Sequence, residues 1–424
     1  MNGHATNDGP SLPSARSPSE FNYWANVGRP WVRAVRAMGR TVLGFDPAPS
    51  DEIVRTFASS YYDADPLAEA FVEEVYLGRG VPAGRAMLDQ ALGHGVGSVE
   101  NAPASLLRLF ADIDADPAWL EPELLERGAR VFRRYGTAIF RFAGAITLEG
   151  YSESSVAKPL ALTGGYAGSS TRRRFLETAA FWIAVSEPGG LAPFSPGRAS
   201  ALRVRVMHVF VRKRLLAHAE WDLEKWGVPI SQGDALLTLM GGSFVPGIAM
   251  QAMGYRPSVR DIEAMMHFWR YVGHLMGVRP SFYPVSLAEA AQLTFVTMVK
   301  GSKTAGEDGR HLCKSYVAAF APDPKAPLFD RLRQTIDHRV HLGYTRFFLP
   351  PWTYKKNELP PAGLWALHPL LQFPFIFTAE TLRRTFPALD AVADRVARRS
   401  RDRWFSRHMG KRRAEYRTPE TLAR

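Results

Sequence analysis

One histidine of the sequence lies among cations at helical spacing. Residues 203–215 read RVRVMHVFVRKRL, in which large apolar residues are interleaved with arginine and lysine. Positions three and four apart share one face of a helix, so Arg205, His208 and Arg212 are predicted to point in the same direction. Two interpretations fit this spacing: a basic stripe on a solvated surface, or a site for a metal group that carries its own carboxylates.

The apolar residues of the same segment favour a buried helix. Val204, Met207, Val211 and Leu215 lie between the charges, so a helix here packs on most sides and some of its arginines are expected to be buried and paired. A haem offers one axial position to an imidazole and carries two propionates, which guanidinium groups bind through paired hydrogen bonds. A lone histidine in a helix is more often a core residue, so both interpretations stay open.

Helical periodicity dominates the elements that must position these residues. Residues 258–278 form a long amphipathic pattern with Met265, Trp269 and Val272 on its apolar side, and another helix is predicted to begin near Ser231. Alternating patterns of the kind that strands show are nearly absent. The sequence therefore predicts an all-α protein: a single helical domain with N- and C-terminal extensions.

The chain is expected to divide into three parts. Residues 1–22 are polar and rich in proline, serine and glycine, which is typical of a disordered tail. Residues 23–350 carry the regular helical patterns. Residues 351–424 combine a proline-broken apolar segment at 364–377 with a basic stretch at 395–413, and are predicted to form an apolar segment followed by a basic C-terminal helix or tail.

Composition limits the classes of function. The excess of 53 Lys+Arg over 41 Asp+Glu favours anionic partners, but it is concentrated near the C-terminus and no nucleic-acid recognition motif is present. The single cysteine, Cys313, rules out an intrachain disulfide. The first residues lack the apolar core of a secretory signal, and no uncharged apolar run is expected to span a bilayer. We expect a cytoplasmic protein, with or without attachment to a membrane surface.

Other histidines are expected to be structural. His267 and His274 lie seven residues apart on one predicted helix, and His338 and His341 lie three apart in DHRVHLGY. The first pair is expected to serve the structure of the helix. The second pair is expected to be exposed or to cap a helix, with a place beside cofactor propionates or behind their ligands as the alternative. The common zinc, phosphate-loop, serine-nucleophile and CxxC signatures are all missing.

Several ordered blocks resemble one known family. LRVRVMHVFVR (202–212), WGVPISQGDALLT (226–238) and IEAMMHFWRYVGHLMGV (262–278) are similar to the DUF2236 family, which includes latex-clearing rubber oxygenases and MpaB-type oxygenases. The blocks GARVFRRYG, AKPLALTGGY and RRRFLET agree as well. The resemblance runs over roughly residues 60–350 and implies that residues 23–350 form an oxygenase domain whose globin-like helical core holds one haem b.

The resemblance also implies roles for particular residues. His208 matches the proximal iron ligand, and Arg205 and Arg212 match its flanking arginines. The stretch 174–178 matches a distal arginine, lysine and threonine of the rubber enzymes, with Arg174 and Thr178 retained and Glu177 in place of the lysine.

The catalytic acid of the rubber enzymes falls near Lys158, so the two charges are exchanged in this chain. Glu177 and Thr178 become candidates to ligate iron, to hydrogen-bond dioxygen or to take an allylic proton. The competing interpretations are a salt bridge from Glu177 to Arg173 or Arg174, and a solvated or structural Lys158.

The leading hypothesis is a haem-b oxygenase that uses dioxygen on a lipophilic, unsaturated, isoprenoid-like small molecule. The alternative is a helical haem- or lipid-binding protein that docks on an anionic membrane through segment 364–377 and the basic stretch, without oxygenase activity.

Overall fold

The computed structural model describes residues 16–164, 170–301 and 303–410, and this part of the chain is helical without a strand. The all-α prediction is confirmed. The α-helices are α1 (Tyr23–Asn26), α2 (Pro30–Leu43), α3 (Asp51–Ser59), α4 (Pro66–Phe71), α5 (Val81–His94), α6 (Ala104–Asp114), α7 (Pro122–Arg134), α8 (Ala138–Gly150), α9 (Ser154–Leu162), α10 (Ser170–Ser186), α11 (Pro196–Leu216), α12 (Leu223–Trp226), α13 (Gln232–Gly242), α14 (Phe244–Ala249), α15 (Val259–Leu275), α16 (Leu287–Lys300), α17 (Gly306–Ala319), α18 (Leu328–Phe348), α19 (Pro351–Lys356), α20 (His368–Leu371), α21 (Phe373–Thr385) and α22 (Ala388–Met409). Short 3₁₀ or π turns lie at Ser60–Tyr62, Val72–Leu77, Val96–Ser98, Met250–Met253 and Gly363–Leu367.

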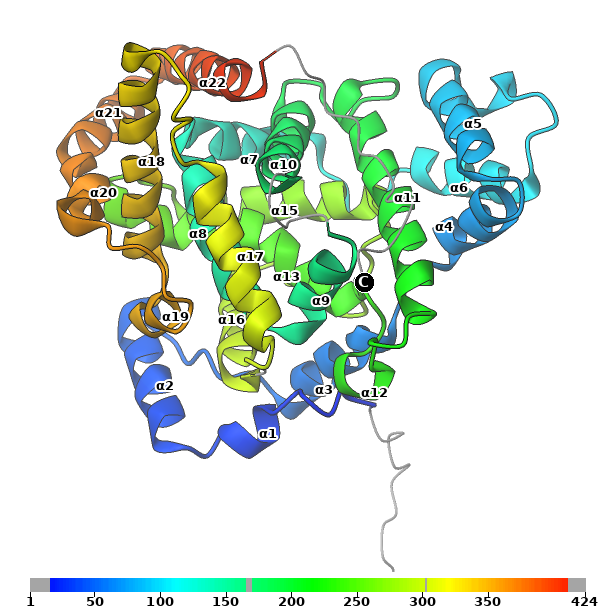
Figure 1. The fold of residues 1–424 in the computed structure, drawn as a ribbon, viewed down its shortest axis with the longest axis horizontal. Helices are drawn as coiled ribbons and strands as arrows, with labels where there is room; N and C mark the ends of the chain where they lie inside the picture. Colours follow the sequence, from blue (N-terminus) through cyan, green and yellow to red (C-terminus); the bar gives the residue numbers. More distant parts are fainter. Residues whose placement is uncertain (1–15, 165–169, 302, 411–424) are drawn as a thin grey trace, which may run out of the picture.

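Helix α15 occupies the centre of the molecule (Figure 1) and packs against α7, α11, α13, α14 and α16. Its start is set by a capping box, in which the Ser258 hydroxyl accepts from the Asp261 amide and the Asp261 carboxylate accepts from the Ser258 amide. Its pairing with α7 is close at Gly128, where an added Cβ would lie 2.0 Å from the carbonyl oxygen of Ala264. Only glycine fits at this crossing.

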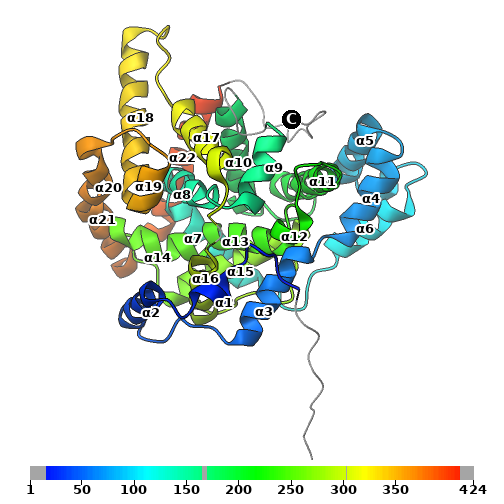
Figure 2. The same cartoon turned by 60° about the horizontal axis from the view of Figure 1, so that its bottom comes forward.

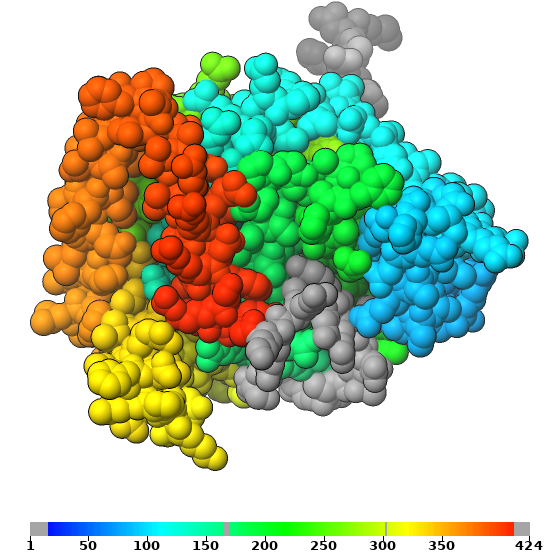
Figure 3. Space-filling model, turned by 90° about the horizontal axis from the view of Figure 1, so that it is seen from above, coloured from blue at the N-terminus to red at the C-terminus, as the bar shows by residue number. Residues whose placement is uncertain are grey.

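Two groups of helices flank the centre on opposite sides. Helices α4, α5 and α6 form a lobe beside α11, while α18, α20 and α21 lie at the other end (Figures 1 and 2). From above, α21 and α22 run side by side along the edge of the molecule far from the lobe (Figure 3), and the two helices are in contact. Helix α11 therefore lies between the centre and the lobe.

The predicted disordered tail is wrong for the residues that the structure describes. Phe21 is buried and its ring lies near those of Phe57 and Tyr61, and the Ser19 amide donates to the carbonyl of Glu224. An aromatic side chain gives this polar segment enough apolar area to pack. Residues 1–15 lie outside the described part of the chain.

The predicted boundary at residue 350 does not separate two bodies. Helix α22 packs on α7 and α10, and its Trp404 and Arg401 are buried. The Arg401 guanidinium donates to the Ser186 hydroxyl and to the Glu187 carboxylate at the end of α10. The basic C-terminal helix was expected to be an extension. Instead it covers the core, because every third or fourth of its side chains faces inward. Residues 411–424 lie outside the described residues.

One stretch passes the length and hydropathy test for a membrane-spanning helix. It is Gln232–Met253, with mean hydropathy 1.4 and 56% of its tested window buried inside the fold. By length and composition, the expectation that no apolar run is long enough to span a bilayer is therefore wrong. In the structure the stretch is divided at Ser243, where α13 ends and α14 begins, and most of it belongs to the core.

Candidate active site

Helix α11 carries the predicted iron ligand in a buried setting. The Ser195 hydroxyl caps the helix by accepting from the Arg198 amide, and Pro196 occupies the first turn. His208 lies in the middle of the helix and keeps some accessible surface. Burial lowers the pKa of His208 to about 4, and the positive charge of Arg212 acts in the same direction. The imidazole is therefore neutral at pH 7, as a metal ligand must be.

The His208 ring also lacks a partner. Among the residues that the structure describes, no hydrogen bond or ion pair involves His208. A neutral imidazole whose nitrogens are not engaged by other described residues fits a side chain that would hold a haem iron. In the same described residues, no group of three His, Cys, Asp or Glu side chains could hold a bare metal ion. The donor set fits a haem better than a protein-ligated ion, since a haem needs one side chain.

Arg205 lies one turn before His208, as its spacing predicts, and is fully buried. Its Nε and Nη2 donate to the two carboxylate oxygens of Asp65 at 2.7 and 2.9 Å, and its Nη1 lies 3.4 Å from Asp112. Asp112 also accepts two bonds from Arg279. The described contacts of Arg205 thus join α11 to the lobe, and its role toward a propionate stays a prediction.

Arg212 lies one turn after His208 and is held in the same way. Its Nε and Nη2 donate to the carbonyl oxygens of Pro229 and Ile230 at 2.9 and 2.6 Å, and its Nη1 lies 3.2 Å from the Glu69 carboxylate. The structure rejects the solvated basic stripe for Arg205 and Arg212, whose side chains are 1% and 5% exposed. A carboxylate-bearing cofactor would share these cations with groups of the chain itself.

Helix α10 holds Glu177 and Thr178. The buried Glu177 carboxylate lies 3.2 Å from Arg173 Nε and 3.4 Å from Arg174 Nη1. The ion pair that competed with a ligand role is therefore present, and it fixes the carboxylate beneath two more exposed guanidiniums. The Thr178 hydroxyl donates to the Arg174 carbonyl oxygen at 3.1 Å.

Lys158 on α9 lies in a different set of contacts. Its ammonium is 2.9 Å from Asp308 and 3.1 Å from Glu220. Burial alone would lower its pKa, but the hydrogen bonds to these two carboxylates outweigh that effect and raise it. No ion pair between Lys158 and Glu177 occurs in the described ranges, so these contacts support the structural interpretation of Lys158.

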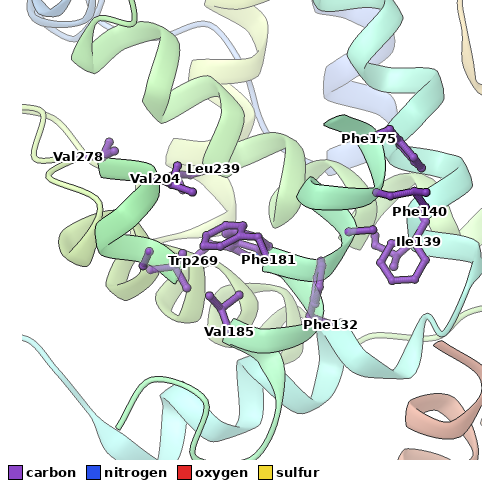
Figure 4. Close-up of a cluster of buried hydrophobic side chains, with 14 of the residues drawn as sticks. Phe132, Ile139, Phe140, Phe175, Phe181, Val185, Val204, Leu239, Trp269 and Val278 are labelled. Carbon is purple, nitrogen blue, oxygen red and sulfur yellow. The ribbon is translucent and has the colours of Figure 1, made fainter. Parts of the chain in front are cut away.

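An apolar cluster adjoins the faces that carry His208 and Glu177. Figure 4 shows Phe181 of α10 and Trp269 of α15 close together, with Val204 of α11 beside them. Val204 lies one turn before His208, and Phe181 lies one turn after Glu177, so each shares a helix face with a candidate site residue. All three are buried. A hydrocarbon-like surrounding suits an apolar substrate.

The other histidines singled out in the sequence lie in different environments. The His267 ring accepts from the Glu121 amide at the start of α7, and burial followed by the charge of Arg279 lowers the pKa of His274 to about 4. Both serve the structure, as expected. The expected exposed or capping role is wrong for His341, which is buried because α8, the turn at Gly363–Leu367 and α20 pack against α18 and the Phe320 ring stacks on the imidazole.

Sequence reasoning missed the carboxylates that hold the two arginines. Asp65, Asp112 and Glu69 lie 140, 93 and 143 residues away from their partners along the chain. Asp65 carried a local signal, since it precedes Pro66 and its side chain caps α4 by accepting from the Ala68 amide. That signal predicted a helix start but not the partner across the fold.

The fold and the sequence together define an oxygenase. Residues 129–400 match the family described as ER-bound oxygenase mpaB/B'/Rubber oxygenase, catalytic domain. Because this match covers more than half of the chain, the protein belongs to that family.

A curated relative and a solved structure extend the comparison. The chain is 25% identical over 386 residues to the rubber oxygenase of Streptomyces sp. (strain K30), covering 82% of this chain and 91% of that protein. The structure of latex clearing protein LCP in the closed state covers 85% of this chain and 95% of its own, with a TM-score of 0.60 and 19% identity. This last likeness shows a shared fold.

Proposed function

We propose that the protein is a haem-b-dependent oxygenase that acts with dioxygen on a lipophilic, unsaturated, isoprenoid-like small molecule. Family membership supports the oxygenase class. The observation that carries the haem assignment is the neutral, unpartnered imidazole of His208 inside α11. A haem bound there supplies the redox chemistry that dioxygen requires.

The chain's own residues would perform the remaining tasks. His208 would hold the haem iron, and Arg205 and Arg212 hold its helix in place through Asp65, Glu69 and two backbone carbonyls. The buried contacts on both sides keep α11 from rotating, which fixes the direction of the imidazole.

Glu177, Thr178 and Arg174 are the proposed polar groups on the substrate side. The ion pairs with Arg173 and Arg174 hold the Glu177 carboxylate in one position, where it could ligate the metal or accept an allylic proton at an oxygen atom. Phe181 and Trp269 supply the apolar wall that excludes water (Figure 4). A lipophilic alkene fits this combination of one carboxylate and a hydrocarbon surface.

The function is tested with the purified full-length chain loaded with haemin. Squalene is a suitable small isoprenoid alkene, and oxygen uptake together with new carbonyl or hydroxyl products is the measurement. We expect uptake by the wild type and its loss in His208→Ala, while His267→Ala, a matched control outside the site, retains it. Haem binding without oxygen uptake on any isoprenoid alkene would refute the oxygenase assignment for this substrate class.

A second candidate function is docking on an anionic membrane. Leu364, Leu371 and Phe375 are 84%, 67% and 77% exposed on the surface formed by residues 363–386. On the adjoining α22, exposed residues at helical spacing pass from apolar to basic, since Leu389, Val392 and Val396 are followed by Arg399 and Arg403. We propose that this face, called the α21–α22 face, inserts its apolar side chains between anionic lipids that the arginines bind.

Vesicle flotation tests this docking with the full chain, because α22 is part of the core. We expect the chain to float with vesicles containing phosphatidylserine and to float less in the double variant Leu371→Glu/Phe375→Glu. The double variant Leu328→Glu/Phe329→Glu alters an equally exposed apolar pair at the start of α18 and should float like the wild type. Equal flotation of all three, or a lipid-independent dimer that covers the face, contradicts the proposal.

A further inference from the structure

The C-terminal half of α18 brings a buried histidine to the junction of several helices. His341 is 3% exposed, and neither of its ring nitrogens has a hydrogen-bond partner. Burial holds its pKa well below the ordinary value, and the charge of Arg141 acts in the same direction. The ring is therefore neutral, with one nitrogen that donates and one that accepts.

A series of ring contacts leads from this position through the interior. The His341 ring stacks on Phe320 at 4.3 Å, Phe320 lies 5.4 Å from Tyr316, and Tyr316 lies 5.4 Å from Phe175 of α10. Phe175 in turn lies 6.5 Å from Trp404 of α22. Side chains from α10, from α17 and its C-terminal cap, from α18 and from α22 thus lie together in the interior.

Several polar atoms in this region are buried without a partner. They are the Tyr316 hydroxyl, Trp404 Nε1, Arg141 Nε and both nitrogens of His341. Each unsatisfied buried donor or acceptor costs roughly 1–3 kcal/mol, and native proteins seldom leave several together. Tryptophan and arginine can only donate, and tyrosine can donate as well. These donors could therefore be satisfied by a bound molecule that carries several hydrogen-bond acceptors.

The charge of the region points the same way. Asp337 accepts from Arg141 Nη2 at 2.6 Å and lies 2.8 Å from His408 Nε2, while His408 Nδ1 lies 2.8 Å from the Trp404 carbonyl oxygen. The Asp337 carboxylate is thus held between Arg141 of α8 and His408 of α22.

A further cation comes from the start of α10. Arg172 is half-buried and has no hydrogen bond or ion pair within the part of the chain that the structure describes. Burial lowers its pKa, and the charge of Asp337 opposes this effect only in part. Arg141 and Arg172 are two cations against the single carboxylate of Asp337, which leaves an excess of one positive charge.

This region is separate from the proposed haem side of α10. At 100° per residue, Arg172 and Phe175 lie on the face of α10 opposite to Glu177 and Phe181. Ring contacts of Phe175 are with α17 and α22, whereas Phe181 lies near Trp269 of α15 (Figure 4).

We propose that a group of five side chains, here called the α18 cluster, binds a small organic monocarboxylate. Its members are Arg141, Arg172, Tyr316, His341 and Trp404. Two carboxylate oxygens accept from the guanidinium, phenol, indole and imidazole donors, and the excess of positive charge compensates the anion. The aromatic walls formed by Phe175 and Phe320 suit an organic group better than the hydration shell of an inorganic ion. A metal cation is disfavoured by the same charges.

Fluorine NMR with trifluoroacetate as the probe tests the α18 cluster directly. The full-length chain as purified is titrated at constant ionic strength, and we expect saturable broadening of the probe signal. Tyr316→Phe removes only one oxygen atom and should weaken binding about tenfold, which is the loss of one hydrogen bond to a charged group. His341→Leu should weaken binding at least as much.

Tyr61→Phe is the matched control, because Tyr61 is also buried with an unpartnered hydroxyl but lies among residues of α3 and α16. It should bind the probe like the wild type. The proposal is overturned by the absence of saturable binding, by unchanged binding in Tyr316→Phe, or by inorganic phosphate displacing the probe at lower concentration than acetate does. A crystal structure grown with acetate that holds only water in the cluster would overturn it as well.

Discussion

Removing the carboxylate that pairs with Arg205 gives the sharpest test of how α11 is held. Arg205 is 1% exposed in the fold, and Asp65→Ala removes the partner that accepts its bonds of 2.7 and 2.9 Å. Breaking a buried pair by removing one member costs about 3–5 kcal/mol, because the remaining charge is uncompensated. Asp112, 3.4 Å from Arg205 Nη1, compensates part of this, and the lost cap of α4 adds about 1 kcal/mol.

The expected loss in the free energy of unfolding is therefore about 3–5 kcal/mol, measured by urea denaturation. The neighbouring Arg203 on the same helix provides the control, since its partner Asp89 and Arg203 itself are 45% and 36% exposed. Asp89→Ala should cost about 0–1 kcal/mol. Asp65→Asn keeps an oxygen that can cap α4 but removes the negative charge. It therefore separates the loss of the ion pair from the loss of the helix cap. If Asp65→Ala and Asp89→Ala differ by less than about 1 kcal/mol, the buried pair does not hold α11.

Three further outcomes follow from individual contacts. Gly128→Ala places a Cβ 2.0 Å from the Ala264 carbonyl oxygen, so α7 and α15 must separate; we expect a loss of about 1–3 kcal/mol in urea unfolding, and an unchanged midpoint would contradict the close crossing. The pKa of His208 is about 4 in the fold against an ordinary 6.5, so the unfolded chain takes up a proton at a higher pH than the folded chain does. The stability that this difference contributes is complete above pH 6.5 and is lost as pH falls toward 4. The free energy of unfolding of the haem-free chain should fall by about 3 kcal/mol over that range because of this group. The fall should be absent in His208→Leu, and identical pH profiles of the two proteins would show that His208 is not buried. Lys158→Ala removes the ion pairs to Asp308 and Glu220 and should lower stability by about 1–2 kcal/mol while leaving the spectrum of the haem-loaded protein unchanged; an altered spectrum would instead place Lys158 at the cofactor.

Local signals in the sequence predicted the helices well. Ser231 and Ser258 cap α13 and α15 as their positions suggested, because a cap depends on residues within one turn. The buried side of α15, including Met265, Trp269 and Val272, followed from its periodicity for the same reason. Nearest neighbours along the chain set these features.

The site was predictable only in part. The spacing of Arg205, His208 and Arg212 placed them on one face, yet their burial and partners depend on Asp65, Glu69 and the loop at 229–230. The polar pattern of α18 likewise hid the burial of His341, because α8 and residues 363–371, which pack against α18, come from other parts of the chain. Tertiary packing decides which polar residues face inward, and a single sequence carries no record of it.

The central claim, that His208 holds a haem, is tested most directly by absorption spectroscopy. The purified chain is titrated with haemin and the Soret band is recorded for the wild type, for His208→Ala and for His267→Ala. We expect saturation at one haem per chain for the wild type and for His267→Ala, and loss of most of the band in His208→Ala with folding retained by circular dichroism. An unchanged Soret band in His208→Ala, or no band in the wild type, would contradict the assignment.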